Sequence, residues 1–147
     1  MNLTAHFTVE EFHCHDGTLY PPEWIDERLR PLCAALEAIR EACGGRPVRI
    51  LSGYRTATYN EGLRSSDGSG TGVAKNSQHI QGRAADIAVE GMAPSDVHAA
   101  TLTLYGQGKL EIGGLGLYRG WIHVDVRERV GGHLAQWNGP GVTGAAA

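Results

Sequence analysis

The segment WIHVDVR, residues 121–127, restricts the fold more than any other part of the chain. Aliphatic residues alternate along it with residues of other types, and a period of two is typical of a β-strand that packs one face against a core. The core face consists of Ile122, Val124 and Val126. The other face places His123 and Asp125 side by side on a rigid strand. The chain is therefore expected to build a sheet with one apolar face and one face that presents ionisable groups.

A second short strand is predicted at residues 83–89, RAADIAV, and it contains an unexpected carboxylate. Aspartate is a poor strand residue, and it is seldom buried unless it is paired or bound to a metal ion. Asp86 shares its strand face with two alanines, which leave space beside the carboxylate. His79 lies in the polar loop just before this strand. If the two strands are neighbours, Asp86, His79 and His123 can converge.

Two neutral imidazoles and one carboxylate are ligands that suit zinc, and three protein ligands leave a fourth position for water. A site of this type is catalytic, since structural zinc sites usually close with four ligands, mostly thiolates. The predicted site therefore holds one zinc per chain on His79, Asp86 and His123, and it hydrolyses an amide. Each residue also has an ordinary interpretation: a solvated loop histidine, an aspartate that caps a backbone group, and a hydrogen-bonded His123–Asp125 pair without metal.

The rest of the pattern predicts a small α+β domain. The other predicted elements are a capped helical turn at 8–12, a helix at 22–43, a strand at 47–53, a helix at 94–105, and two strands joined by a turn at Arg119–Gly120. Pro31 should kink or divide the first helix. We expect a mixed or antiparallel sheet of three to four strands with two main helices packed against it. The domain is expected to span residues 1–137, and residues 138–147 to form a disordered tail.

Composition excludes several classes of protein. A hydrophobic content of 41% and a charged content of 20% fit one soluble globular domain and exclude a disordered chain. The net charge of -3 leaves no basic surface for nucleic acid and no polybasic membrane anchor, and no apolar run is long enough to span a membrane. The three cysteines form no CxxC pair, which favours reduced thiols. The start, MNLTAHFTVEEF, has no readable Sec signal, so we expect the protein to be made in the cytoplasm. We also expect it to be a monomer.

Four segments resemble the peptidase M15 family in their order and spacing, and in particular its small bacterial and phage branch. They are SGYRT at 52–56, NSQHIQGRAADI at 76–87, GGLGLY at 113–118 and WIHVDVR at 121–127. The segments FTVEEFHCHDG and GMAPSDV also look like that branch, and the resemblance extends to about residue 137. It implies an M15 or hedgehog-like fold and a zinc peptidase that cuts the peptide stems or cross-links of peptidoglycan.

The resemblance also implies roles for individual residues. It makes the same two histidines and one aspartate the zinc ligands. It places Arg55 beside the scissile carbonyl, where a fixed guanidinium would stabilise the oxyanion of the transition state. Ser77 and Gln78 fall where the family lines its substrate cleft. Without the resemblance, Arg55 would be interpreted as an ordinary exposed arginine.

The chain departs from the family at one position. Many M15 enzymes have Glu or Asp three residues before the last histidine ligand, as general base, but Gly120 occupies this position here. Asp125 is the carboxylate nearest the metal by the strand argument, and we assign it as general base or as the group that orients the metal water. The alternatives for Asp125 are a hydrogen bond to a ligand imidazole and a salt bridge with an arginine.

The predicted function is that of a zinc-dependent peptidoglycan endopeptidase, similar to the endolysin of a phage or prophage. A D-Ala-D-Ala carboxypeptidase is the alternative within the family. A non-catalytic zinc-containing module that binds the cell wall or belongs to a phage tail is the alternative from another class, and Gly120 favours it. Without a Sec signal, the protein would reach the wall through a holin, a secretion machine or a virion. The glycine-rich loop at 65–72 is expected to edge the cleft.

Overall fold

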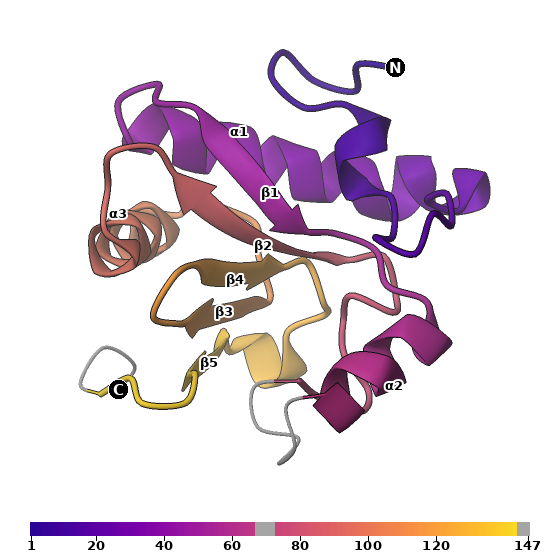
Figure 1. Ribbon diagram of the computed structural model, residues 1–147. Helices are drawn as coiled ribbons and strands as arrows, with labels where there is room; N and C mark the ends of the chain where they lie inside the picture. The colour runs from indigo at the N-terminus through magenta and orange to yellow at the C-terminus, as the bar shows by residue number, and fades with distance from the viewer. Residues whose placement is uncertain (67–72, 144–147) are drawn as a thin grey trace.

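The computed structural model describes residues 1–66 and 73–143. In this part of the chain, five strands form one sheet in the order β1-β2-β4-β3-β5 (Figure 1). Neighbouring strands are antiparallel except for β3 and β5, which run parallel. The strands are β1 (Val48–Ser52), β2 (Ala84–Val89), β3 (Gly114–Leu117), β4 (Ile122–Asp125) and β5 (Ala135–Asn138). The α+β class and the mixed sheet are confirmed, with more strands than the three to four expected.

Three α-helices accompany the sheet within the described residues, one more than the two main helices expected. They are α1 (Arg30–Ala42), α2 (Ala57–Ser66) and α3 (Pro94–Gly106). Helices α1 and α3 contact each other and the sheet, whereas α2 follows the C-terminal end of β1 (Figure 1). None of the described helices combines the length and the hydrophobicity that crossing a bilayer requires.

The helix predicted at 22–43 is divided, as Pro31 suggested. A 3-10 turn at Pro22–Trp24 and a π-helical turn at Ile25–Leu29 precede α1. Pro31 lies in the first turn of α1, directly after the π-helical turn, in which the N–H of Arg30 donates to the carbonyl of Ile25; proline has no N–H group with which to continue this pattern. The buried stripe of this helix includes Leu32, Leu36 and Ile39.

The apolar core lies between the helices α1 and α3 and one face of the sheet. Ile87 of β2 and Ile122 and Val124 of β4 are completely buried in it. This confirms the core face that the alternation in WIHVDVR predicted. Full burial of a side chain of this size stabilises the fold by about 1.5–3 kcal/mol, so the register of β2 and β4 is strongly specified. The other face of both strands is left for polar groups.

Two elements, α2 and β5, were not predicted from the sequence. The helix α2 lies between the strands predicted at 47–53 and 83–89, where no helix was expected. Thr56 caps its start, since its Oγ1 accepts a hydrogen bond of 3.1 Å from the N–H of Tyr59. The side chain of Asn60 is buried and donates to the carbonyl of Ala74 at 2.9 Å. Tertiary contacts therefore stabilise α2 where propensity does not.

The structure describes residues on both sides of residue 137, and the domain end that was expected there stays a prediction. Asn138 is the last residue of β5, and the N–H of Gly139 donates to the carbonyl of Leu117 at 2.7 Å. Residues 144–147 of the predicted tail and residues 67–72 of the glycine-rich loop expected at the cleft lie outside the described residues.

Candidate metal centre

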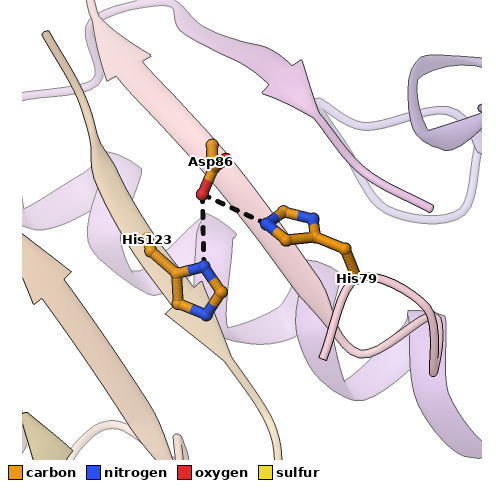
Figure 2. Close-up of side chains that lie close together, drawn as sticks. All are labelled: His79, Asp86 and His123. Atoms are coloured by element: carbon orange, nitrogen blue, oxygen red, sulfur yellow. Dashed lines mark hydrogen bonds and ion pairs between the residues drawn. The ribbon is translucent and has the colours of Figure 1, made fainter. Parts of the chain in front are cut away.

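One row of residues crosses the sheet on the face opposite the core. In sheet order the row consists of Ser52, Asp86, His123, Gly116 and Trp137, each in register with the next. Asp86 and His123 are direct partners on the antiparallel strands β2 and β4. His79 comes from the tight turn before β2. Figure 2 shows the side chains of these three residues pointing toward one another.

The structure brings together the three residues that were predicted as zinc ligands. One ligand atom of each lies within 4.8 Å of the others, and all three side chains are buried. The Oδ1 atom of Asp86 lies 3.3 Å from Nε2 of His79 and 3.2 Å from Nδ1 of His123 (Figure 2). Two imidazole nitrogens and one carboxylate oxygen thus face a common point. This donor set fits a zinc ion with one coordination position left open.

The far side of each candidate ligand is held by a second group. Nδ1 of His79 lies 2.7 Å from the carbonyl of Gly53, and Nε2 of His123 lies 2.7 Å from Oδ2 of Asp125. Both contacts require the ring nitrogen to carry the proton, which leaves a lone pair on Nε2 of His79 and on Nδ1 of His123. Arg55 donates to the second oxygen of Asp86 at 3.2 Å. Such outer contacts are typical of metal ligands.

Burial and charge adjust the protonation of the cluster. Burial lowers the pKa of His79, although the nearby Asp86 opposes this change. Burial alone would raise the pKa of Asp86, but the two histidines outweigh it and hold this pKa well below its usual range. For His123, burial lowers the pKa, and the hydrogen bonds to Asp125 and Asp86 more than reverse the effect. An ionised Asp86 and a neutral His79 are the forms that bind a metal ion.

Arg55 is fixed beside the cluster by three acceptors. Its side chain donates to Ser52 Oγ at 3.1 Å, to Asn60 Oδ1 at 3.2 Å and to Asp86 Oδ2 at 3.2 Å. Its main-chain N–H donates to the carbonyl of His79 at 3.1 Å, which ties the end of β1 to the turn that carries this histidine. Asn60 was not identified from the sequence because it lies in the unpredicted helix α2.

Asp125 lies behind His123 as seen from Asp86. It contacts Nε2 of this ring, whereas Asp86 faces Nδ1. Arg127 pairs with both oxygens of Asp125, through Nε at 2.9 Å and Nη2 at 2.6 Å. The Asp125 side chain is completely buried, and Gly114 of β3 makes room for it, since a Cβ there would overlap the carboxylate. Arg127 was missed, although the alternation in WIHVDVR places it on the same face as the histidine.

A cavity of about 630 Å³ opens above the cluster. Ser77 and Gln78, both predicted to line the substrate cleft, are among its lining residues. Ser77 also accepts a hydrogen bond of 3.1 Å from the N–H of His79 through its Oγ, so it shapes the turn. Gly120 is exposed in the turn between β3 and β4, and a Cβ on it would have no atom within 4 Å.

Three aromatic residues form one wall of this cavity: Tyr118, Trp121 and Trp137. The rings of Tyr118 and Trp121 are stacked, with centroids 4.9 Å apart. Trp137 donates to the Tyr118 hydroxyl at 2.9 Å, and its ring centroid lies 5.0 Å from that of His123. Its indole lies over Gly116, where a side chain would displace it. No local pattern marked Trp137, because β5 carries no alternation.

Comparison with known proteins identifies the family of the chain. The model of the peptidase M15 family matches residues 5–125. The chain belongs to the peptidase M15 family. The match ends at Asp125, so Arg127 and Trp137 lie beyond it. The family that the four sequence segments indicated is thereby confirmed.

Individual relatives match part of the chain. It is 37% identical over 83 residues to the peptidoglycan L,D-endopeptidase MepK of Escherichia coli. These residues make up 55% of this chain and 41% of that protein. It is 33% identical over 94 residues to the probable peptidoglycan L,D-endopeptidase MepK of Haemophilus influenzae, or 63% of this chain and 43% of that protein. It is also 33% identical over 105 residues to the zinc D-Ala-D-Ala carboxypeptidase of Streptomyces albus G, or 71% of this chain and 36% of that protein. The chain therefore spans less than half the length of these relatives.

Proposed function

We propose that this M15 chain is a zinc-dependent peptidase that hydrolyses amide bonds in the peptide stems or cross-links of peptidoglycan, as an endopeptidase. The observation that carries the proposal is the buried cluster of His79, Asp86 and His123 beneath the cavity. The names of the relatives supply the substrate class, because they act on peptidoglycan or on a D-Ala-D-Ala peptide and one is a zinc enzyme.

One zinc ion per chain would be held by His79 through Nε2, by His123 through Nδ1 and by Asp86 through Oδ1. A zinc ion with three protein ligands supplies Lewis acidity and lowers the pKa of a water molecule bound to it. The Gly53 carbonyl and Asp125 keep the two imidazoles in the tautomers that such binding needs.

Arg55 acts on the negative charge that develops on the carbonyl oxygen of the substrate. Arg55 lines the cavity, and its contacts with Ser52, Asn60 and Asp86 fix its guanidinium before substrate arrives. A donor that is already oriented stabilises the transition state without the cost of reorganisation. Ser77 and Gln78, which also line the cavity, bind the substrate chain.

Asp125 is proposed to orient His123 and to keep its Nε2 protonated. The contact with the far ring nitrogen, the complete burial and the bidentate pairing with Arg127 support this role over that of a general base. A general base needs access to the proton that it removes. Asp86 is the one carboxylate among the described residues that line the cavity, and it is a candidate metal ligand.

The glycine at position 120 and the contacts of Asp125 also favour a second candidate function. A chain with Gly120 in place of the usual acid, and with Asp125 engaged by Arg127, could bind zinc and wall peptides without cutting them. This module would retain the metal centre and the cavity, so the two functions differ in product formation alone.

The deciding experiment measures zinc content and the release of muropeptides from purified sacculi for the wild type, His123→Ala and Asp125→Asn. The exposed residue His133 provides a control, His133→Ala. The peptidase predicts near one zinc per chain and product release in the wild type and the control, with both lost in His123→Ala. Asp125→Asn should retain part of the zinc and lose most of the activity. Zinc without product in the wild type, with binding to the sacculi retained, would support the binding module.

The bond that is cut can be assigned from the products. An endopeptidase converts cross-linked muropeptide dimers to monomers, whereas a carboxypeptidase shortens stems by their terminal residue. An endolysin role is part of the same proposal, supported by the resemblance to the bacterial and phage branch. Co-expression with a holin tests it, because an endolysin then lyses the host. Size-exclusion chromatography with light scattering tests the proposed monomer.

A further inference from the structure

Three arginines line the cavity: Arg55, Arg119 and Arg127. Two of them are paired with carboxylates, Arg55 with Asp86 at 3.2 Å and Arg127 with Asp125 at 2.6 Å. Arg119 differs from both, because no carboxylate of the described residues lies within ion-pair distance of it. The cavity therefore has a positive charge that the described part of the protein does not neutralise.

The position of Arg119 is defined by its surroundings. It lies in the turn between β3 and β4, and its guanidinium rests on Gly141. A Cβ at Gly141, where φ is +75°, would overlap the guanidinium group. One Nη2–H group of Arg119 donates to the Gly141 carbonyl at 3.4 Å. Within the described residues this is its one hydrogen bond, so most of its donors remain available to a ligand.

The residues on either side of Arg119 make this turn rigid. Tyr118 and Trp121 stack with an interplanar angle of 10°, and Tyr118 accepts the hydrogen bond from Trp137. The guanidinium is thus presented next to an ordered aromatic wall of the cavity. A planar fork of N–H donors matches a carboxylate in geometry as well as in charge.

We propose that Arg119 forms a subsite for a carboxylate of the peptide substrate, so that the protein selects peptides with a free carboxylate over the same peptides amidated at that position. The inference deepens the proposed function, on which it rests, by naming a feature of the substrate. Arg119 in this role is a specificity-determining residue, separate from the metal ligands and from Arg55.

The test uses the zinc-loaded protein and pairs of synthetic stem peptides. The two members of a pair differ at one position, which is a carboxylate in the first and a carboxamide in the second. The ratio of kcat/KM for the acid over the amide is measured at each carboxylate in turn. At one position the wild type should prefer the acid by about tenfold, as expected for a charged hydrogen bond at a partly exposed site. Arg119→Gln should reduce that ratio to about one, and Arg119→Lys should give an intermediate value.

Two further variants separate a subsite from a general effect of charge. Gly141→Ala keeps the arginine but displaces its guanidinium, so it should lower the ratio as Arg119→Gln does. Arg46 is a matched control: it donates to the Glu90 carbonyl at 3.4 Å, rests near Gly91, and is not among the residues that line the cavity. Arg46→Gln should leave the ratio unchanged. An acid preference that survives Arg119→Gln, or a wild type with no acid preference at any position, would overturn the proposal.

The same peptides distinguish a failure of the proposed peptidase function from a failure of the Arg119 subsite. If the wild type releases no product from any of them, the peptidase fails, and the dissociation constants of the peptide pairs then replace kcat/KM. A tenfold preference for the acid that Arg119→Gln removes would support the subsite in a binding module. Equal dissociation constants for acid and amide, or a preference that Arg119→Gln leaves in place, would refute it.

Discussion

At the scale of single residues, His123 is held on both sides of its ring. Asp86 faces Nδ1 and Asp125 faces Nε2, while Arg127 neutralises the buried Asp125 and its guanidinium lies 5.1 Å from the centre of the Trp137 ring. The side chains thus form a chain of contacts from the aromatic wall to the candidate metal centre. The geometry of the ligand then depends on an arginine that does not touch the metal position.

Arg127→Gln is expected to weaken zinc binding. The substitution leaves the buried carboxylate of Asp125 without its ionic partner, so that His123 is no longer oriented by a fixed acceptor. Loss of such an outer contact raises the dissociation constant for zinc by about 10-fold to 100-fold, which competition with a chromophoric chelator measures. Arg129→Gln is the control, since Arg129 pairs with the exposed Glu111 and contacts Tyr105 instead. Equal zinc affinities of the two variants would refute this role of Arg127.

At the scale of elements, the short strand β3 determines what fits on the site face. Its outward positions are the glycines Gly114 and Gly116, which pair with Asp125 and His123 on β4. The first glycine accommodates the Asp125 carboxylate and the second accommodates the indole of Trp137. The two positions therefore support different parts of the site.

Alanine at these two positions should separate metal binding from substrate binding. Gly114→Ala displaces Asp125 and should lower zinc affinity at least tenfold, by the same outer-contact argument. Gly116→Ala displaces Trp137 and should raise KM and change the tryptophan fluorescence, with zinc content unchanged. Gly106→Ala, at the end of α3 with no atom within 4 Å of the added Cβ, is the control for both. The division of roles would be wrong if both variants lost zinc to the same extent.

How far the sequence predicts these elements depends on the range of the contacts. The alternation in β4 and the aspartate in β2 identified the core face and the convergence of His79, Asp86 and His123, because strand periodicity is a local signal. The position of β5 follows from its parallel pairing with β3. The segment AQWN has no alternation of apolar and polar residues from which a strand could be predicted. The alternation also placed Asp125 on the same face as His123. It does not determine which ring nitrogen of His123 the carboxylate contacts.

At the scale of the whole molecule, the cysteines belong to the core and not to a site. Cys14, Cys33 and Cys43 are free and buried. Burial raises the pKa of Cys33 to about 12, with the negative charges of Glu11 and Glu37 adding to the effect. Burial also raises the pKa of Cys43. A thiol in this state has little of the nucleophilic thiolate form near neutral pH.

The native protein should therefore react slowly with thiol reagents. A colorimetric disulfide reagent at pH 8 is expected to titrate less than one thiol per chain within minutes, and all three after denaturation. Fast reaction of one thiol in the native state would show that the part of the core around it opens readily. Repeating the titration with zinc bound tells whether that opening involves the metal centre.

Zinc should stabilise the entire domain, because the candidate ligands join elements that are distant in sequence. His79 precedes β2, Asp86 lies within it and His123 lies on β4. A ligand that binds only the folded state at about 1,000 times its dissociation constant adds roughly 4 kcal/mol. In a chain of this size that shifts Tm by about 8–16 °C. Calorimetry of the wild type with zinc and after removal of zinc by a chelator should show this shift.

The control is the comparison of two histidine substitutions. His123→Ala removes a ligand from the centre of the sheet and should abolish most of the dependence of Tm on zinc. His133→Ala changes an exposed residue and should retain it. Adventitious zinc binding at surface histidines would instead leave the dependence of Tm on zinc in His123→Ala. A shift that depends on His123 alone therefore links the metal to this cluster independently of any catalytic activity, and it does so for a peptidase and for a binding module alike.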